Sequence, residues 1–321
     1  MTRGYVLRRI LQLVPTAAAI LLVGFLLIHL APGDPVLALA GENGDAEYYA
    51  LVREKFGLDE PLPAQLATYA GNILTGDLGT SYVLGRPVRD VIAERLPATL
   101  LLTSSALGIS TVLGIAGGVF TATRHRRGAA TAVTVTTLAM YAAPAFLVGQ
   151  LAILLLALRL GLFPVQGMSD ARSSATGTAQ VFDVAHHLVL PTLALAAQEI
   201  AAVSRLSHVA LVEEMGRDHI RTARAKGLPE RTVVLRHGLR RAMLPVVTVL
   251  GGRVGHLVAG AVVIEVVFGW PGLGRLLVTS MQSRDTPVVL GVFLLVAATV
   301  VVANLLTDLV YALLDPRVRF R

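Results

Sequence analysis

Side chains able to catalyse a reaction are scarce in this chain of 321 residues, and those present form no familiar catalytic motif. The sequence contains no cysteine, no His-Glu-x-x-His pair and no Gly-x-Ser-x-Gly turn. Thiol, zinc-hydrolase and serine-hydrolase sites of the usual kinds therefore lack their residues. His186 and His187 are adjacent rather than one helical turn apart, which is poor geometry for joint metal binding. We predict a protein without enzymatic chemistry or a metal site.

The lysines also exclude the common ATP-binding loop. That loop needs Gly-Lys followed by Ser or Thr. The two lysines of the chain are Lys55, which follows Glu54, and Lys226, which precedes Gly227. Any ATP-driven work must therefore come from a partner.

The elements that must hold the remaining polar groups are membrane helices. The chain is 54% hydrophobic and only 15% charged, with a mean hydropathy of +0.67. Apolar windows longer than about 18 residues are what a bilayer span requires. We expect six α-helical spans, because lipid-exposed backbone must satisfy its hydrogen bonds internally. They are predicted at 10–31, 96–123, 128–158, 188–203, 242–267 and 288–314.

The fourth span depends on a topological argument. Residues 188–203 contain Pro191 and Glu199, so hydropathy alone scores them as marginal. The basic clusters at 124–127 and 205–241 should both face the cytoplasm, which requires an even number of crossings between them. Both termini are then cytoplasmic. We predict an N-terminal part, 1–95, with the first span and a long acidic extracytoplasmic segment, and a five-helix core, 96–321, in which 205–241 is a cytoplasmic loop.

Four ionisable residues fall within these spans: Glu199, Arg253, His256 and Glu265. Such groups are costly in lipid and normally face a partner or a water-filled path. Arg253 and His256 are three residues apart, so they should share a helix face. This face either borders a translocation path or forms an ion pair between helices. The steps Gly114/Gly118 and Gly251/Gly255 are predicted to let helices pack closely.

The stretch RTARAKGLPERTVVLRHGLRRAMLP, residues 221–245, is the longest basic segment. Helical propensity should end at Gly227, and Pro229 should open a second short helix to about His237. Ala223 and Gly227 would let another surface approach the backbone, while Arg221, Arg224 and Lys226 could pair with acids. The alternative is a polybasic region that only anchors to anionic lipid. A nucleic-acid role is disfavoured, because the basic residues lie beside apolar spans with few aromatics among them.

This segment, RTARAKG followed at a distance by Leu244–Pro245, resembles the coupling loop of ABC importer permeases. Arg221 stands where the general motif has Glu, but the RTARAKG form is typical of peptide-type permeases. GDLGTSY, RLGLFPVQG, HLVLPTLALA, VFGWPGLGRLL, SRDTPVVLGVFLL and NLLTDLVYALLDPRVR also resemble the dipeptide/oligopeptide permease family, and its B-type subunit in particular.

The resemblance implies an all-α ABC type I importer permease in a bacterial cytoplasmic membrane. It implies a C-type second permease, one or two ATPase subunits that bind ATP and Mg, and an extracytoplasmic substrate-binding protein as partners. Contact with the ATPase would fall to Arg221, Thr222, Ala223, Arg224, Lys226 and Gly227. The binding protein would contact Gly76, Asp77, Tyr82 and Trp270, although a tight turn at GWPGLG and interfacial packing at GDLGTSY are the competing interpretations. Other members of the family carry nickel, haem or glutathione.

A stand-alone carrier or channel is the second class of protein to consider. Such proteins usually show inverted repeats or paired broken helices, and no clear internal repeat is visible here.

Overall fold

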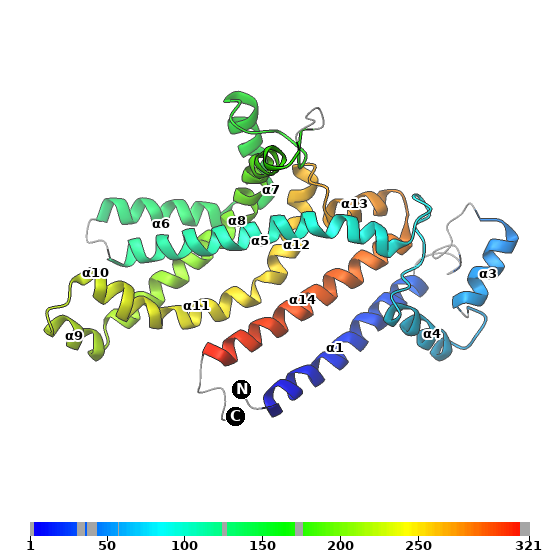
Figure 1. Ribbon diagram of the computed structural model, residues 1–321, viewed down its shortest axis with the longest axis horizontal. Helices are drawn as coiled ribbons and strands as arrows, with labels where there is room; N and C mark the ends of the chain where they lie inside the picture. The colour runs from blue at the N-terminus through cyan, green and yellow to red at the C-terminus, as the bar shows by residue number, and fades with distance from the viewer. Residues whose placement is uncertain are drawn as a thin grey trace. The chain divides into compact units, whose positions relative to one another are not determined.

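The computed structural model describes residues 3–30, 36, 44–56, 58–123, 127–170 and 176–314. Every named element in this part of the chain is a helix (Figure 1). Contacts group the residues into two units, one made of 100–270 with 303 onward and the other of 2–99 with 271–302. The division at residue 95 therefore stays a sequence-based prediction. Each unit is described by itself.

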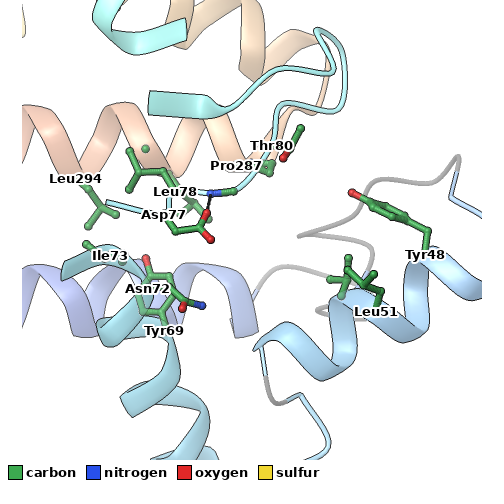
Figure 2. A pocket seen from close by; sticks show the side chains of 14 residues that line it. Tyr48, Leu51, Tyr69, Asn72, Ile73, Asp77, Leu78, Thr80, Pro287 and Leu294 are labelled. Atoms are coloured by element: carbon green, nitrogen blue, oxygen red, sulfur yellow. Dashed lines mark hydrogen bonds between the residues drawn. The ribbon is translucent and has the colours of Figure 1, made fainter. Parts of the chain in front are cut away.

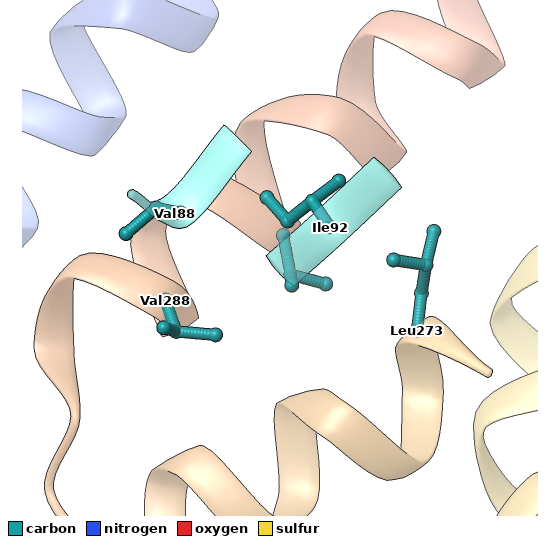
Figure 3. Packing of buried hydrophobic residues seen from close by; sticks show 5 residues of the cluster. Val88, Ile92, Leu273 and Val288 are labelled. Atoms are coloured by element: carbon teal, nitrogen blue, oxygen red, sulfur yellow. The ribbon is translucent and has the colours of Figure 1, made fainter. Parts of the chain in front are cut away.

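The unit of 2–99 and 271–302 joins N-terminal and C-terminal helices. It contains α1 (Arg3–Leu30), α3 (Ala46–Phe56), α4 (Leu62–Leu74), α13 (Leu273–Gln282), the start of α5 (Val88–Thr123) and the start of α14 (Thr286–Leu314). Its core combines β-branched and leucine side chains of α5, α13 and α14 (Figure 3). The buried members are Val88, Ile92, Leu273, Val288 and Val292.

The other unit is arranged around α8 (Thr178–Met215), which packs against α6 (Arg127–Ala142), α7 (Ala145–Ala152), α11 (Arg240–Gly252) and α12 (Val254–Val267). Between α7 and α8 lies η1 (Ile153–Arg159), a π-helix. Between α8 and α11 lie α9 (Asp218–Ala225), α10 (Glu230–Thr232) and the π-helix η2 (Val233–Leu239). Within the most apolar window of α8, 72% of the residues are buried.

Glycines on α5 allow that helix to contact α8 directly. A Cβ added at Gly114 would lie 2.6 Å from the Cβ of Val203, and one at Gly118 would lie 2.6 Å from the backbone oxygen of Ser204. The predicted close packing at Gly114/Gly118 is confirmed. Gly251 likewise lies against Thr307 of α14, but Gly255 lies in the next helix, so the second predicted step is not one continuous helix face.

Among the described residues, three helices are long and apolar enough to cross a membrane: α5, α8 and the 286–305 part of α14. Residues 11–27 of α1 form a shorter apolar helix, and two bent pairs, α6 with α7–η1 and α10–α11 with α12, also pass when each is counted as one span. The six predicted spans all fall on helices. Their number as true crossings and the placement of the termini stay predictions.

Two of the predicted spans are not continuous helices. The third, 128–158, bends by 108° between Ala142 and Ala145, and the fifth, 242–267, bends by 59° near Arg253. Pro144 explains the first bend, because proline lacks an N–H and disfavours helical geometry in the residue before it. At this break, the backbone oxygen of Ala143 accepts a hydrogen bond of 3.0 Å from the side chain of Gln198.

The predicted loops are shorter than expected. The loop 159–187 ends where α8 begins, at Thr178, and α8 then runs through Pro191 and Glu199 without interruption. The predicted cytoplasmic loop 205–241 is also largely helical, since α8 continues to Met215 and η2 leads directly into α11. Tertiary burial of α8 outweighs the weak local signal of its sequence.

Candidate functional site

The segment 216–239 forms a tight helix–turn–helix after α8. Asp218 lies in the first turn of α9, where a negative charge favours a helix N-terminus. At the other end, Gly227 adopts a φ of +74°, and its N–H donates to the oxygen of Arg224 at 2.9 Å. Pro229 precedes α10. The helix stop at Gly227 and the start at Pro229 are confirmed, whereas an end near His237 is wrong, because the helix continues through η2.

The two faces of α9 have different roles. Ile220 and Ala223 are buried against Val233 of η2, with Met215 packed beside them. Arg221, Thr222, Arg224 and Lys226 are exposed. The side chain of Ala223 is only 5% exposed and packs into the protein's own core, so the approach of another surface at Ala223 stays a prediction. Gly227 does face open space, since an added Cβ would meet nothing within 4 Å.

Two of the motif arginines are paired within the chain. Arg224 donates to both carboxylate oxygens of Glu230, at 3.1 and 2.7 Å, and so ties α9 to α10 across the turn. This hydrogen bonding raises the pKa of the Arg224 guanidinium. Arg221 lies 3.4 Å from Asp218. These arginines support the turn itself as well as giving it positive charge.

A basic groove of about 620 Å³ lies beside this turn. It contains four formal cations, two histidines and no acidic side chain. The lining residues are His219, Thr222, Ala223, Lys226, Leu228, Arg236, His237, Arg240, Arg241 and Leu244. We call this surface the basic groove. Sequence reasoning missed Arg236, Arg240 and Arg241 as site residues, although all three belong to the basic stretch 221–245.

The buried carboxylate of Glu214 lies beside His219, which lines the basic groove. Glu214 lies 3.0 Å from Arg217 and 3.2 Å from Nε2 of His219. The Arg241 guanidinium donates to Nδ1 of His219 at 3.4 Å. His219 thus connects the end of α8 to the beginning of α11.

Glu199 and Arg253, two of the ionisable residues predicted within the spans, form an ion pair. Arg253 donates to Glu199 at 2.8 Å, which confirms the interpretation as an ion pair between helices. Arg253 is the junction between α11 and α12, so the continuous face predicted for Arg253 and His256 is wrong. His256 lies in α12, and its side chain is outside the described residues. Glu265 is fully buried near the end of α12.

Of the four residues predicted to contact the binding protein, three are exposed or partly exposed and one is buried. Gly76 is exposed with a φ of +81°, Asp77 accepts a hydrogen bond from the N–H of Gly79 at 3.0 Å (Figure 2), and Tyr82 is half-buried. Trp270 is 0% exposed, so a side-chain contact with a partner is wrong there. The tight-turn interpretation holds instead, because Gly269 has a φ of +59° and the N–H of Trp270 donates to Glu265 at 2.8 Å.

Asp285 was missed by the sequence analysis, yet it organises GDLGTSY. This buried carboxylate accepts from the hydroxyl of Ser81 and from the backbone N–H of Tyr82 at 3.2 Å. It therefore brings together two stretches, GDLGTSY and SRDTP, that are more than 200 positions apart. The available signal was an acid just before the Thr-Pro that begins α14.

Comparisons with known proteins match nearly the whole chain. The family model described as "Binding-protein-dependent transport system inner membrane component" covers residues 114–320, and the model of the corresponding N-terminal region covers 1–103. The glutathione transport system permease protein GsiC of Escherichia coli K12 is 39% identical over 318 residues, which is 99% of each chain. GsiC of Salmonella paratyphi A is 40% identical over 323 residues, again 99% of each chain.

Solved structures share the fold. A structure of the MetNI methionine ABC transporter in an inward-facing conformation matches with a TM-score of 0.57 and 16% identity, covering 70% of this chain and 96% of that one. An amino acid ABC transporter matches with a TM-score of 0.50, also at 16% identity, covering 71% and 94%. With the family models and the relatives, these matches show that the chain belongs to the binding-protein-dependent transport system inner membrane components, the membrane-embedded permeases of bacterial ABC importers.

Proposed function

We propose that the chain is the B-type permease subunit of an importer for small peptides and peptide-like molecules. Its relatives are named glutathione permeases, and glutathione is itself a small peptide. The chain would form the path together with a C-type permease, while an extracytoplasmic binding protein delivers the substrate. One or two ATPase subunits would bind ATP and Mg, because the chain has no Gly-Lys-Ser/Thr loop.

The α9 turn and the basic groove are proposed as the contact with the ATPase. The observation that carries this is the exposed left-handed turn at Gly227 beside a concavity with four formal cations and no acid. Such a surface fits a partner segment that carries carboxylates, since complementary charge steers and orients docking. The α9 turn is also rigid, because Ile220 and Ala223 are buried beneath it and Arg224 binds Glu230 across it. A rigid contact can transmit a movement of the ATPase to α8 and α11.

A pair of substitutions at Gly227 tests this contact. Asn tolerates positive φ and is close to Asp in shape, so Gly227→Asn and Gly227→Asp differ mainly in charge. We expect the complete transporter with Gly227→Asp to lose about tenfold in uptake, or in ATPase activity stimulated by the binding protein, while Gly227→Asn keeps most of it. Equal activity of the two variants at wild-type level would argue against a charge-sensitive contact at Gly227.

The same experiment separates ATPase coupling from lipid anchoring. If the segment only anchored to anionic lipid, both variants would co-purify normally with the ATPase subunit. Loss of co-purification in Gly227→Asp alone, with equal amounts of permease in the membrane, would support the proposed contact.

The Glu199–Arg253 pair is proposed to hold the break between α11 and α12 rather than to bind substrate. The two side chains satisfy one another at 2.8 Å, and Glu199 is almost fully buried. An Arg253→Ala transporter that inserts normally and transports at the wild-type rate would contradict any role of this pair in transport.

A further inference from the structure

One face of α7 and the start of η1 is exposed and carries a single amide among large apolar side chains. The apolar side chains, each 41–47% exposed, are Phe146, Leu147, Leu151 and Leu154. Gln150 is exposed among them, and its side chain has no hydrogen-bond partner in the part of the chain that the structure describes. An amide has both donors and an acceptor, and leaving them unpaired in hydrocarbon is costly. The Gln150 amide therefore needs a polar partner outside the described residues.

The opposite face of α7 is already packed within the protein. Its small residues, Ala145, Gly149 and Ala152, are buried or half-buried, and α7 packs against α8 and α12. A Cβ added at Gly149 would lie 3.0 Å from the ring of Phe268, so α7 cannot turn to bury Gln150. Membrane helices dock closely through small residues. The exposed face has large ones instead, which suits contact with a helix of a second permease poorly.

Two helix breaks lie beside the same section of α8, and α7 follows one of them. The chain bends by 108° between α6 and α7 (Figure 1), and Gln198 of α8 donates to the backbone oxygen of Ala143 there. The next residue of α8, Glu199, binds Arg253 at the break between α11 and α12. Both residues lie near the middle of α8.

This arrangement of breaks indicates where a path runs. Irregular backbone at membrane depth is tolerated where it is buried in protein or lines a water-filled cavity. In transport proteins, interrupted helices lie beside the substrate. Gln150 lies in the second turn of α7, directly after the first break. A water-filled path beside this section of α8 therefore gives the Gln150 amide the polar surroundings that lipid does not.

We propose that Gln150 lines the translocation path and that its side-chain amide hydrogen-bonds the main chain of a peptide in transit. The peptide part of this inference rests on the proposed function. A primary amide has the same kinds of donor and acceptor as a peptide group, so it pairs with the N–H and the C=O of an extended peptide. It is uncharged, so the contact does not depend on the side chains of the substrate. Phe146 and Leu147 then offer apolar contact to those side chains.

The absence of cysteine from the chain allows a direct test of the path. The complete transporter with Gln150→Cys is reconstituted in proteoliposomes and treated with a membrane-impermeant maleimide during ATP-driven turnover. The reactive thiolate forms in water and is disfavoured in apolar surroundings. We therefore expect this chain to be labelled at least about tenfold faster than with Val112→Cys, since Val112 is an exposed apolar residue of α5.

Labelling of Gln150→Cys no faster than that of Val112→Cys would place Gln150 against lipid or the second permease and would overturn the proposal. If Gln150→Cys does not assemble, Phe146→Cys decides in the same way, because it lies one turn earlier on the same face.

A second substitution tests the contact with the peptide. Gln150→Met removes the amide and keeps an unbranched side chain of similar length. Uptake of radiolabelled glutathione or trialanine should fall about tenfold, as the loss of two hydrogen bonds gives. The unfolding temperature should not fall, because the amide has no partner among the described residues. Gln12→Met, at an exposed glutamine near the start of α1, is the matched control and should transport normally.

Wild-type uptake in Gln150→Met, or an equal loss in Gln12→Met, would refute the peptide contact. If wild type carries neither peptide, the proposed function and the peptide contact fail together. The maleimide labelling still decides in that case whether Gln150 lines a path, because labelling does not depend on which substrate is carried.

Discussion

At the scale of single residues, Glu199 shows how this apolar chain keeps a buried charge. Its carboxylate lies in the middle of α8 and is bound by Arg253 at 2.8 Å. Removing one partner of such a pair leaves an uncompensated charge, which costs more than the pair contributes while it is intact. Arg253 is also the residue at which α11 ends and α12 begins. One contact therefore satisfies the carboxylate and holds the break in the helix.

This pairing predicts a non-additive double mutant. Arg253→Ala should destabilise the protein by about 2 kcal/mol, since Glu199 loses its partner. Adding Glu199→Ala should restore part of that loss, because the unpaired charge is gone. Thermal unfolding in detergent measures both variants, with Arg231→Ala as an exposed arginine control. Strictly additive effects of the two substitutions would show that the pair is not coupled.

The sequence predicted this pair but not every site residue. Few ionisable residues lie within the apolar spans, so Glu199 and Arg253 were candidates for one another before the structure was known. The burial of Ala223 and Trp270 could not be predicted, because it depends on which face of a short helix or turn packs inward. Asp285 was missed for a related reason, since its hydrogen-bond partners lie more than 200 positions earlier in the chain.

At the scale of elements, the close contact between α5 and α8 requires glycine at positions of α5 where a larger side chain would not fit. A Cβ at Gly118 would lie within 3 Å of the backbone of α8, at Ser204 O and His208 N. Gly108, on the same helix, has nothing within 4 Å of the corresponding position. Gly118→Ala should therefore destabilise the protein by about 1–3 kcal/mol through overpacking, whereas Gly108→Ala should be neutral or slightly stabilising.

Thermal unfolding of the two glycine variants, together with their yield in the membrane, measures this difference. Both substitutions add the same methyl group to the same helix, so composition and helix propensity are matched. A stable Gly118→Ala variant would mean that α8 can move away from α5 at little cost.

Helix positions were largely predictable from the sequence, whereas helix continuity was not. Most of the apolar stretches were visible in the sequence, although the fourth contains Glu199 and the fifth contains Arg253 and Glu265, and each falls on a helix. The bends within the third and fifth spans were not predicted, although Pro144 marks the first of them. Proline is often tolerated inside a helix, as Pro97 in α5 and Pro191 in α8 show. At the break before Pro144, Gln198 satisfies the backbone oxygen of Ala143 from a distant helix, a contact that local sequence does not reveal.

At the scale of the whole molecule, charge is sorted along the sequence. The segment 32–95 carries ten acids and five bases, whereas basic residues are concentrated in 205–241. The sequence predicts the membrane class and the orientation from this asymmetry, because short cytoplasmic loops are enriched in Lys and Arg. It could not predict that Arg236, Arg240 and Arg241 line one groove with Lys226, since that requires η2 and α11 to fold back beside α9.

As the proposed ATPase contact, the basic groove predicts that assembly with that subunit depends on salt. Exposed charges are screened beyond about 10 Å at 0.1 M salt and beyond about 3 Å at 1 M, so co-purification should weaken as salt is raised. Arg236→Glu with Arg240→Glu should weaken it at low salt by about tenfold and remove most of the salt dependence. Arg231→Glu is the matched control, because Arg231 is exposed on α10 but does not line the groove. If the control lowers assembly as much as the groove variant does, only the overall positive charge of this face matters, and the groove is not the contact.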